Sequence, residues 1–307
     1  VFLSLPKGFA AFLWVVPVIY VARKMGSRVC AELAGMRFEF RHRPSQWRIA
    51  YPVLNAITSL RYLAHSIREA HRELNGPYPV VFYNGVEAPP PPQRENAVDH
   101  LRVSYVGALE PAKGFDVFID TACLAGKLGL PIEWTAVGEW CHAAYREAVF
   151  ARLKTVRPEP RVSFPGLLLG KQKWRAYQSA DVLLHPSRLD GQPLAILEAM
   201  SQGLAIIAGR VGAIPETLVD GRNGRLLDRF DPTIILDTLA EWRADPQRLR
   251  AISEQNVEDF KVRFTAERYV RRFSEWLHAV ARGEVNRFED DWPPAPEAPR
   301  DDRTVAI

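Results

Sequence analysis

The stretch His185-Pro-Ser-Arg-Leu-Asp-Gly-Gln-Pro-Leu-Ala-Ile-Leu-Glu198 decides the fold, because it joins two different structural patterns. It follows the apolar run Asp181-Val-Leu-Leu184, which predicts a buried strand. It continues into a helix that we expect to begin near Pro193, since the fixed φ of proline suits the first helical turn. The N–H groups of such a loop and the positive end of such a helix can bind an anion. The stretch therefore predicts a strand, a polar loop and a helix N-terminus that form a candidate ligand site.

The same stretch carries two carboxylates, Asp190 and Glu198, eight residues apart. Carboxylates at this spacing can accept hydrogen bonds from the hydroxyl groups of a ligand. Two acids so placed are more often solvated surface residues, so the motifs around them must decide.

Short apolar runs alternate with helical segments through the second part of the chain. Strands are predicted at 101–106, 132–138, 161–164, 181–185, 204–208 and 224–227, and helices at 113–128, 142–155, 171–178, after 193 and after 212. This alternation is typical of a parallel sheet covered by helices on both faces. Ligands of such sheets bind at the carboxyl ends of the strands. Three more helices are predicted at 232–244, 246–260 and 265–281.

The first part of the chain is less regular. Residues 9–22 are apolar and contain Pro17, and they are shorter than the roughly 20 residues that a membrane-spanning helix needs. We interpret them as a helix packed on a sheet, with a membrane-associated segment as the alternative. Strands are predicted at 28–33 and 80–83, and a helix at 57–74. A basic cluster follows the first predicted strand and comprises Arg37, Arg41, His42, Arg43 and Arg48. It is either a solvated face or a contact for an acidic lipid headgroup or a phosphate-bearing acceptor.

Composition limits the class of protein. The chain has 307 residues, of which 47% are hydrophobic and 25% charged, as expected for a folded globular protein with room for two domains. The net charge is +4. Three cysteines without metal or redox spacing indicate a reducing compartment. No G-x-G-x-x-G follows a predicted strand, which argues against a dinucleotide-dependent oxidoreductase.

Four linked motifs resemble those of the retaining GT-B glycosyltransferases. The family signature E-G-x-P-x-x-x-L-E-A-M-A-x-G stands here as Asp190-Gly191-Gln-Pro193-Leu-Ala-Ile-Leu197-Glu198-Ala-Met-Ser-Gln-Gly203. The other motifs are Val106-Gly107-Ala108-Leu109-Glu-Pro-Ala-Lys113-Gly114, Gly212-Ala-Ile-Pro215-Glu216 and Asp220-Gly221-Arg-Asn-Gly224, with Asn84-Gly85-Val86 at the expected end of a first domain. Inside the helical stretch 57–74, Ser59-Leu-Arg-Tyr-Leu-Ala-His-Ser66 also resembles a strand followed by serine in the family. Their order over about 120 residues makes the resemblance specific.

The resemblance implies an α/β fold of GT-B type, with two Rossmann-like, doubly wound parallel-sheet domains facing a cleft. We expect a partial N-terminal acceptor-side domain and a proline-rich linker in residues 1–97. A C-terminal nucleotide-sugar-binding domain should follow in 98–282, and a disordered tail in 283–307. Because the chain begins with Val1, we expect the first domain to be incomplete.

The resemblance also assigns roles. Lys113 would bind the diphosphate of the donor, Asp190 the hydroxyls of the donor sugar, and Glu198 the ribose, with Lys113 and Asp190 as the catalytic pair. The remaining donor-binding positions would offer mainly backbone groups: Gly107, Gly138, Gly166, Leu167, Gly191, Gln192, Pro193 and Leu194. No Asp-x-Asp pair occurs, so we expect no metal and no cofactor.

The implied function is a retaining glycosyltransferase of polysaccharide biosynthesis that moves a sugar from a nucleotide sugar to a glycan or lipid-linked acceptor. We expect it in the cytoplasm, with peripheral contact to the inner face of a membrane and no nucleic-acid partner. The alternative is a catalytically impaired homologue. Ala34 replaces a family histidine and Ala108 a family arginine, and Arg188 and Arg210 are candidates to supply the missing charge.

Overall fold

The computed structural model describes residues 1–6, 8–33, 42–74, 76–92 and 100–288. Among these residues the chain forms two compact units, each considered by itself. The first contains residues up to 87 together with 190–192 and 263–288, and the second contains the rest. This division differs from the predicted domains, because residues 263–282 belong to the first unit. The pair Ala34–Gly35, residues Arg37 and Arg41, positions 93–99 and most of the predicted tail (289–307) lie outside the described residues.

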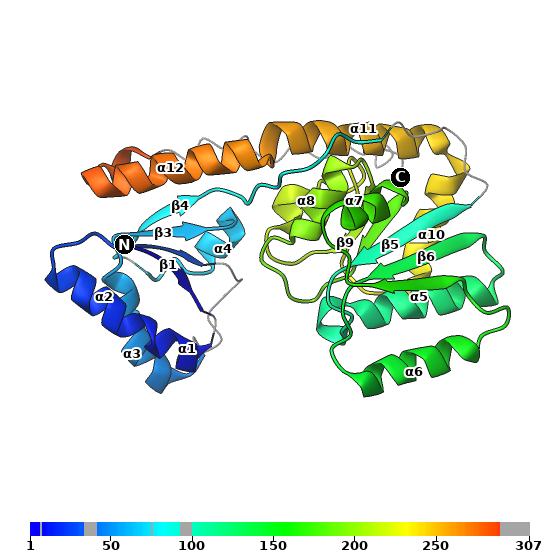
Figure 1. Cartoon of the computed structure of the whole chain (residues 1–307), viewed down its shortest axis with the longest axis horizontal. Coiled ribbons are helices and arrows are strands. Elements are labelled where there is room, and N and C mark those ends of the chain that lie inside the picture. The colour runs from blue at the N-terminus through cyan, green and yellow to red at the C-terminus, as the bar shows by residue number, and fades with distance from the viewer. Residues whose placement is uncertain (7, 34–41, 75, 93–99, 289–307) are drawn as a thin grey trace, which may run out of the picture. The chain divides into compact units, whose positions relative to one another are not determined.

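The second unit is built on a six-stranded parallel sheet, as predicted (Figure 1). Its strands are β5 (Leu101–Val106), β6 (Ile132–Val137), β7 (Val162–Gly166), β8 (Val182–His185), β9 (Ala205–Gly209) and β10 (Arg225–Leu227). Their order is β10-β9-β8-β5-β6-β7, so the chain builds outward from β5 in one direction and then from β8 in the other. The point of reversal, between β5 and β8, is where doubly wound sheets bind their ligands.

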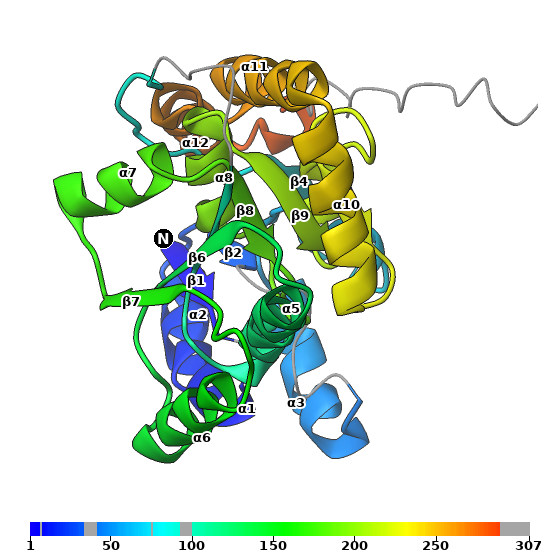
Figure 2. The same ribbon diagram turned by 90° about the vertical axis from the view of Figure 1, so that its right-hand side faces the viewer.

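Helices cover both faces of this sheet (Figures 1 and 2). They are α5 (Phe115–Lys127), α6 (Ala143–Lys154), α7 (Gly170–Gln178), α8 (Leu194–Ser201), α9 (Ile214–Thr217), α10 (Pro232–Ala244) and α11 (Pro246–Arg263), with the 3₁₀ turn η1 (Pro111–Lys113) before α5. The core between β5, β6 and α5 is aromatic. Phe118 meets Trp134 edge-on at 5.3 Å between ring centroids, and Tyr105 packs on Phe115 at 5.0 Å.

The first unit holds a four-stranded parallel sheet whose strands follow chain order: β1 (Phe2–Leu5), β2 (Cys30–Leu33), β3 (Ser59–Tyr62) and β4 (Tyr78–Val81). Helices α1 (Phe9–Leu13), α2 (Val15–Lys24), α3 (Pro44–Asn55) and α4 (His65–Glu69) connect the strands. Helix α12 (Ala266–Arg282) packs on this sheet through aromatic rings, and the indole of Trp276 donates to Ser59 Oγ at 2.9 Å. This packing explains why the last helix belongs to the first unit.

One predicted helix of the first unit is wrong. Residues 57–74 form the strand β3 and the short helix α4 instead of one helix. All four residues of β3 are buried, with β2 on one side and β4 on the other. Pairing on both edges overrides the helical pattern of the sequence. The predicted helix at 9–22 is confirmed as α1 and α2, whose buried side chains are Phe12, Ile19 and Ala22.

No helix in the described part of the chain is long and apolar enough to cross a bilayer.

A buried arginine holds the first unit together. Arg61 on β3 is 1% exposed. Its Nη1 donates to Glu32 Oε2 at 2.7 Å, its Nε and Nη2 donate to the carbonyl of Phe82, and Nη2 also donates to Asn84 Oδ1 at 3.0 Å. Burial lowers the pKa of Arg61, and the nearby carboxylate of Glu32 opposes that shift. One guanidinium therefore ties together β2, β3 and the segment that follows β4.

We predict that Arg61→Met destabilises the protein by about 3 kcal/mol, because it leaves several buried acceptors without their donor. Urea unfolding followed by circular dichroism measures the loss. Arg72→Met is the matched control: Arg72 pairs with Glu69 at the surface, where such a pair contributes less than about 1 kcal/mol. Equal losses in the two variants would contradict the role given to Arg61.

Candidate functional site

Lys113 lies at the reversal point of the second sheet. It ends the turn η1 that follows β5, and its Nζ donates to the carbonyl of Leu189, in the loop after β8, at 3.1 Å. The hydroxyl of Tyr105 supports this turn by donating to the carbonyl of Ala108 at 2.7 Å. The predicted cation is therefore placed between the ends of two neighbouring strands, beside the start of α5.

Gly114 explains how the two loops come so close. Its φ is +75°, and a Cβ at this position would lie 1.9 Å from the carbonyl oxygen of Pro186. Only glycine permits this approach. The glycine in the Lys113-Gly114 pair therefore brings the start of α5 onto the loop after β8, where the signature begins.

Three of the predicted glycines lie together at the carboxyl ends of β5, β6 and β7. The N–H of Gly107 donates to Val137, and the N–H of Gly138 donates to Gly166, each at 3.0 Å. A Cβ on Gly138 would lie 1.8 Å from the carbonyl oxygen of Gly107. The edge of the sheet is thus a surface of closely packed backbone, and Leu167, next to Gly166, is exposed on it.

Glu198 is held by two side chains of α7 that we did not predict. It lies on α8 and is 8% exposed. Its Oε1 accepts from Lys173 Nζ at 2.5 Å, and its Oε2 accepts from the hydroxyl of Tyr177 at 2.8 Å. Burial, and then the negative charge of Glu198, raise the pKa of Tyr177 well above its ordinary value. The signal in the sequence is weak: Lys173 and Tyr177 are four residues apart and so share one helix face.

Residues Asp190, Gly191 and Gln192 group with the first unit. The Oε1 atom of the buried Gln192 accepts from the N–H of Asn84 at 2.6 Å. The side chain of Asn84 in turn accepts from Arg61. Two motifs of the sequence, Asn84-Gly85-Val86 and Asp190-Gly191-Gln192, are thus joined by a hydrogen bond. Pro193, the next residue, is the N-cap of α8, and Leu194 begins that helix.

The two arginines proposed to replace the missing cation at Ala108 are paired with carboxylates. Arg188 forms a two-pronged pair with Asp116, at 2.7 and 2.8 Å. Arg210 Nε lies 2.8 Å from Asp228 Oδ1, and its Nη2 lies 3.5 Å from Asp220. Neither guanidinium therefore presents an uncompensated positive charge.

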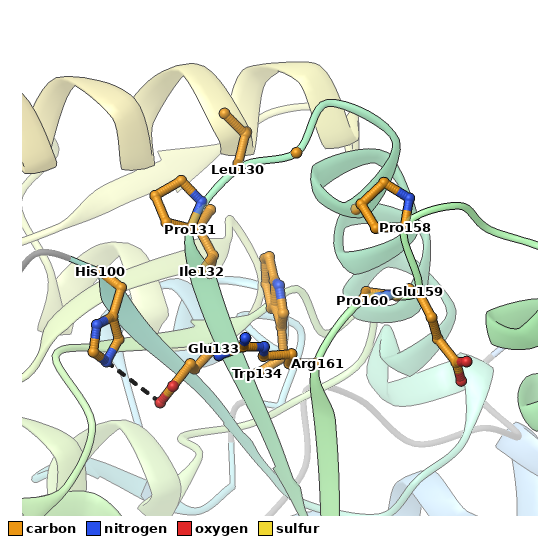
Figure 3. Close-up of a pocket in the computed structure, with 12 residues that line it drawn as sticks. His100, Leu130, Pro131, Ile132, Glu133, Trp134, Pro158, Glu159, Pro160 and Arg161 are labelled. Carbon is orange, nitrogen blue, oxygen red and sulfur yellow. Dashed lines mark ion pairs between the residues drawn. The ribbon is translucent and has the colours of Figure 1, made fainter.

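A hollow of about 440 Å³ lies at the opposite edge of the same sheet (Figure 3). Glu133 and Trp134, at the start of β6, line it together with Pro158 and Arg161, and His100 forms an ion pair with Glu133 at 3.5 Å. Because it lies at the amino ends of the strands, this hollow is separate from the site at Lys113. Within the described residues, no group of three or more His, Cys, Asp or Glu side chains could hold a metal ion.

We predict that Tyr177→Phe destabilises the protein by about 1–3 kcal/mol, since Glu198 Oε2 loses a buried donor. The raised pKa means that the folded state holds the phenol proton more tightly than the unfolded state. The stabilisation by the protonated Tyr177 phenol is complete below about pH 10 and is lost as the pH rises further. The free energy of unfolding then falls by at most about 1.4 kcal/mol per pH unit. Unfolding curves from pH 8 to 11 should therefore show a shallower alkaline loss in Tyr177→Phe.

Tyr20→Phe is the control for that measurement, because Tyr20 is exposed. It should leave both the stability and its pH dependence unchanged. A Tyr177→Phe variant that behaved like the control would contradict the buried contact.

Comparison with known proteins places this site in a family. Residues 100–245 match the family described as "Glycosyl transferases group 1". The chain is 32% identical over 147 residues to a GDP-mannose-dependent alpha-mannosyltransferase of Corynebacterium glutamicum, covering 48% of this chain and 32% of that protein. It is 28% identical over 173 residues to the lipopolysaccharide core biosynthesis mannosyltransferase LpcC of Rhizobium leguminosarum, covering 55% and 48% of the two proteins. The chain thus spans a third to a half of the length of these relatives.

Solved structures show the same fold. The Anabaena protein HepE, crystallised in complex with UDP-glucose, has a TM-score of 0.76 at 17% identity, covering 91% of this chain and 78% of that one. Sucrose-phosphate synthase from Thermosynechococcus elongatus has a TM-score of 0.74 at 16% identity, covering 92% and 74%. Residues 100–245 therefore match the group 1 glycosyltransferases, in a chain that has the GT-B fold of these solved structures.

Proposed function

We propose that this protein is a retaining glycosyltransferase that moves a sugar from a nucleoside-diphosphate sugar to a glycan or lipid-linked acceptor. The observation that carries the proposal is the position of Lys113, at the reversal point of the sheet and bonded to the loop that leads into the signature. A doubly held carboxylate, Glu198, lies on the helix that follows that loop. The family match over residues 100–245 supports the same conclusion.

Lys113 would stabilise the leaving group. In the reaction, the bond between the anomeric carbon and the diphosphate oxygen breaks, and its electron pair stays on the diphosphate. The acceptor oxygen bonds to the anomeric carbon, and its proton passes to the departing diphosphate oxygen. A fixed cation beside the diphosphate lowers the barrier, because negative charge grows there in the transition state. The bond from Lys113 to a backbone carbonyl can be exchanged for one to a phosphate oxygen, and the positive end of α5 adds to the attraction.

Glu198 would bind the ribose of the donor. Each carboxylate oxygen has two lone-pair positions, and Lys173 and Tyr177 use one on each oxygen. Both oxygens can therefore accept a ribose hydroxyl while the two protein contacts remain. Lys173 and Tyr177 act here as positioning residues, since each holds one oxygen of the carboxylate.

The other expected roles remain part of the proposal. Asp190 would bind the sugar hydroxyls, and the backbone from Gly191 to Leu194 would face the sugar and phosphates. Gly166 and Leu167 would meet the nucleobase with backbone groups. A lipid-linked acceptor is supported by LpcC, a relative named for lipopolysaccharide core biosynthesis. Metal-independent chemistry and a cytoplasmic place of action remain predictions from the sequence.

One observation favours a second candidate, a homologue that binds a nucleotide sugar without turnover. Ala108 supplies no charge, and both arginines near the strand ends are neutralised by carboxylates. Loss of one charge-assisted contact to the leaving group costs about 3 kcal/mol, which is about 100-fold in rate. The two candidates agree on binding and differ in catalysis.

The test offers the protein UDP-glucose or GDP-mannose and follows the sugar by NMR. Release or transfer of sugar with the donor's anomeric configuration supports the retaining transferase. Binding measured by calorimetry without any turnover supports the second candidate. Absence of binding to both donors, and to UDP and GDP, would overturn both.

We predict that Lys113→Ala weakens binding of the nucleoside diphosphate and lowers the transfer rate by about 100-fold or more, while the melting temperature changes little. The reason is the loss of the cation at the diphosphate, in a turn whose backbone stays intact. Lys127→Ala, an exposed lysine at the far end of α5, is the matched control. Equal affinity for UDP or GDP in the two variants would remove Lys113 from the site.

We predict that Glu198→Gln lowers the affinity for UDP by about tenfold, because an amide is a weaker partner for the ribose hydroxyls than a carboxylate. The comparison ligand is 2′,3′-dideoxy-UDP, which lacks both hydroxyls. Its affinity should be the same in wild type and variant. A variant that loses both ligands equally would show that Glu198 acts through the fold and not through the ribose. Glu254→Gln, at an exposed position of α11, controls for the change in charge.

A further inference from the structure

Arg188, in the loop after β8, bonds to the turn that carries Lys113. Its Nη1 donates to the carbonyl of Pro111 at 2.6 Å, and its backbone N–H donates to the carbonyl of Ala112 at 3.3 Å. Pro111 and Ala112 are the first two residues of η1, and Lys113 is the third. One arginine therefore holds two of the three carbonyl groups of this turn, directly before the lysine proposed to bind the diphosphate.

The guanidinium of Arg188 is itself fixed in place. Its Nη1 and Nη2 donate to the two carboxylate oxygens of Asp116, in the first turn of α5, at 2.7 and 2.8 Å. Its Cζ lies 5.1 Å from the ring centroid of Phe230, a residue that packs against the core of the second unit. Nη1 thus uses both of its hydrogens, one on Asp116 and one on Pro111. A lysine has no planar fork and cannot reproduce this set of contacts.

These contacts can persist through the exchange that diphosphate binding requires. In the proposed reaction, Lys113 gives up its bond to the carbonyl of Leu189 and binds a phosphate oxygen instead. That exchange removes the lysine's own bond between the turn and the loop. Arg188 bonds to the turn through groups that take no part in the exchange, so it can keep the turn in place while Lys113 binds the ligand.

We propose that Arg188 is a positioning residue, which holds the turn so that Lys113 Nζ meets the diphosphate. The inference rests on the proposed function, and it gives Arg188 a different task from that of a cation replacing the one missing at Ala108. The charge of Arg188 is balanced by Asp116, whereas its geometry fixes the backbone that carries Lys113. A displacement of about 1 Å in such a group can cost about 100-fold in rate.

Calorimetry with UDP or GDP, whichever wild type binds, tests this role. We expect Arg188→Met and Arg188→Lys each to weaken binding by about tenfold or more. The lysine variant keeps the positive charge but loses the fork, so it separates geometry from charge. Binding of the matching nucleoside, uridine or guanosine, is followed by NMR and should stay at the wild-type level, because a nucleoside has no phosphate for Lys113 to bind. A general loss of structure would weaken both ligands.

The variant Asp116→Asn gives a result whose sign separates the two tasks. If only charge mattered, loss of this negative charge should strengthen diphosphate binding, and it would also release Arg188 as a cation. If Arg188 positions the turn, the same change should weaken binding, because the guanidinium loses its partner. Asp120→Asn makes the same change of charge one turn further along α5, where Asp120 pairs with Arg152. It should not weaken binding.

Arg152→Lys is the matched control for the arginine. The side chains of Arg152 and Asp120 are 53% and 36% exposed, close to the 40% and 36% of Arg188 and Asp116. This control should bind the nucleotide as wild type does. Since both pairs are partly exposed, all these variants should melt within about 5 °C of wild type.

A double variant tests whether Arg188 acts through Lys113. In the Lys113→Ala background, Arg188→Met should cause no further loss of affinity, because the group that it positions is gone. Additive losses, wild-type affinity in Arg188→Lys, or tighter binding in Asp116→Asn would each overturn the inference and leave the proposed function standing. Failure of wild type to bind either UDP or GDP would overturn the proposed function, and the inference with it.

Discussion

Parallel pairing around β5 is the constraint on which the site depends. In a parallel sheet all carboxyl ends lie at one edge, and the order β10-β9-β8-β5-β6-β7 sends the connections after β5 and β8 in opposite directions. The turn with Lys113 and the loop with Leu189 therefore meet at that edge, 3.1 Å apart at the hydrogen bond between them. Glycine at 114 makes the approach sterically possible. The candidate site is thus assembled by the order of the strands and then by contacts between side chains and loops.

Two buried charged groups show how the fold supplies partners to charged side chains that it removes from water. Arg61 and Glu198 each contact partners from other segments. Arg61 donates from both terminal nitrogens of its guanidinium, and Glu198 accepts with both oxygens of its carboxylate. A buried charge is tolerated only when such partners surround it. The consequences differ. Arg61 is enclosed by backbone and side-chain acceptors and serves the structure, whereas Glu198 is the carboxylate that we propose for binding the ribose.

Charge is distributed unevenly along the chain. Near the strand ends of the second unit, arginines are neutralised by Asp116, Asp220 and Asp228, so Lys113 is the cation proposed for the diphosphate. In the first 68 residues ten lysines and arginines stand against two glutamates. The net charge of +4 for the whole chain does not reveal this uneven distribution.

The sequence by itself determined the parallel α/β architecture of the second unit and the position of Lys113. The architecture follows from short apolar runs between helices, and the place of Lys113 was expected from the resemblance of its motif to that of the family. The tertiary structure alone decided three other features. It made residues 59–62 a central strand, where the helical pattern and the resemblance to the family disagreed, because pairing on both edges outweighs local helical preference. It attached α12 to the first sheet through aromatic contacts. It also placed Lys173 and Tyr177 on Glu198, more than 20 residues away, and no local periodicity encodes a contact between two helices.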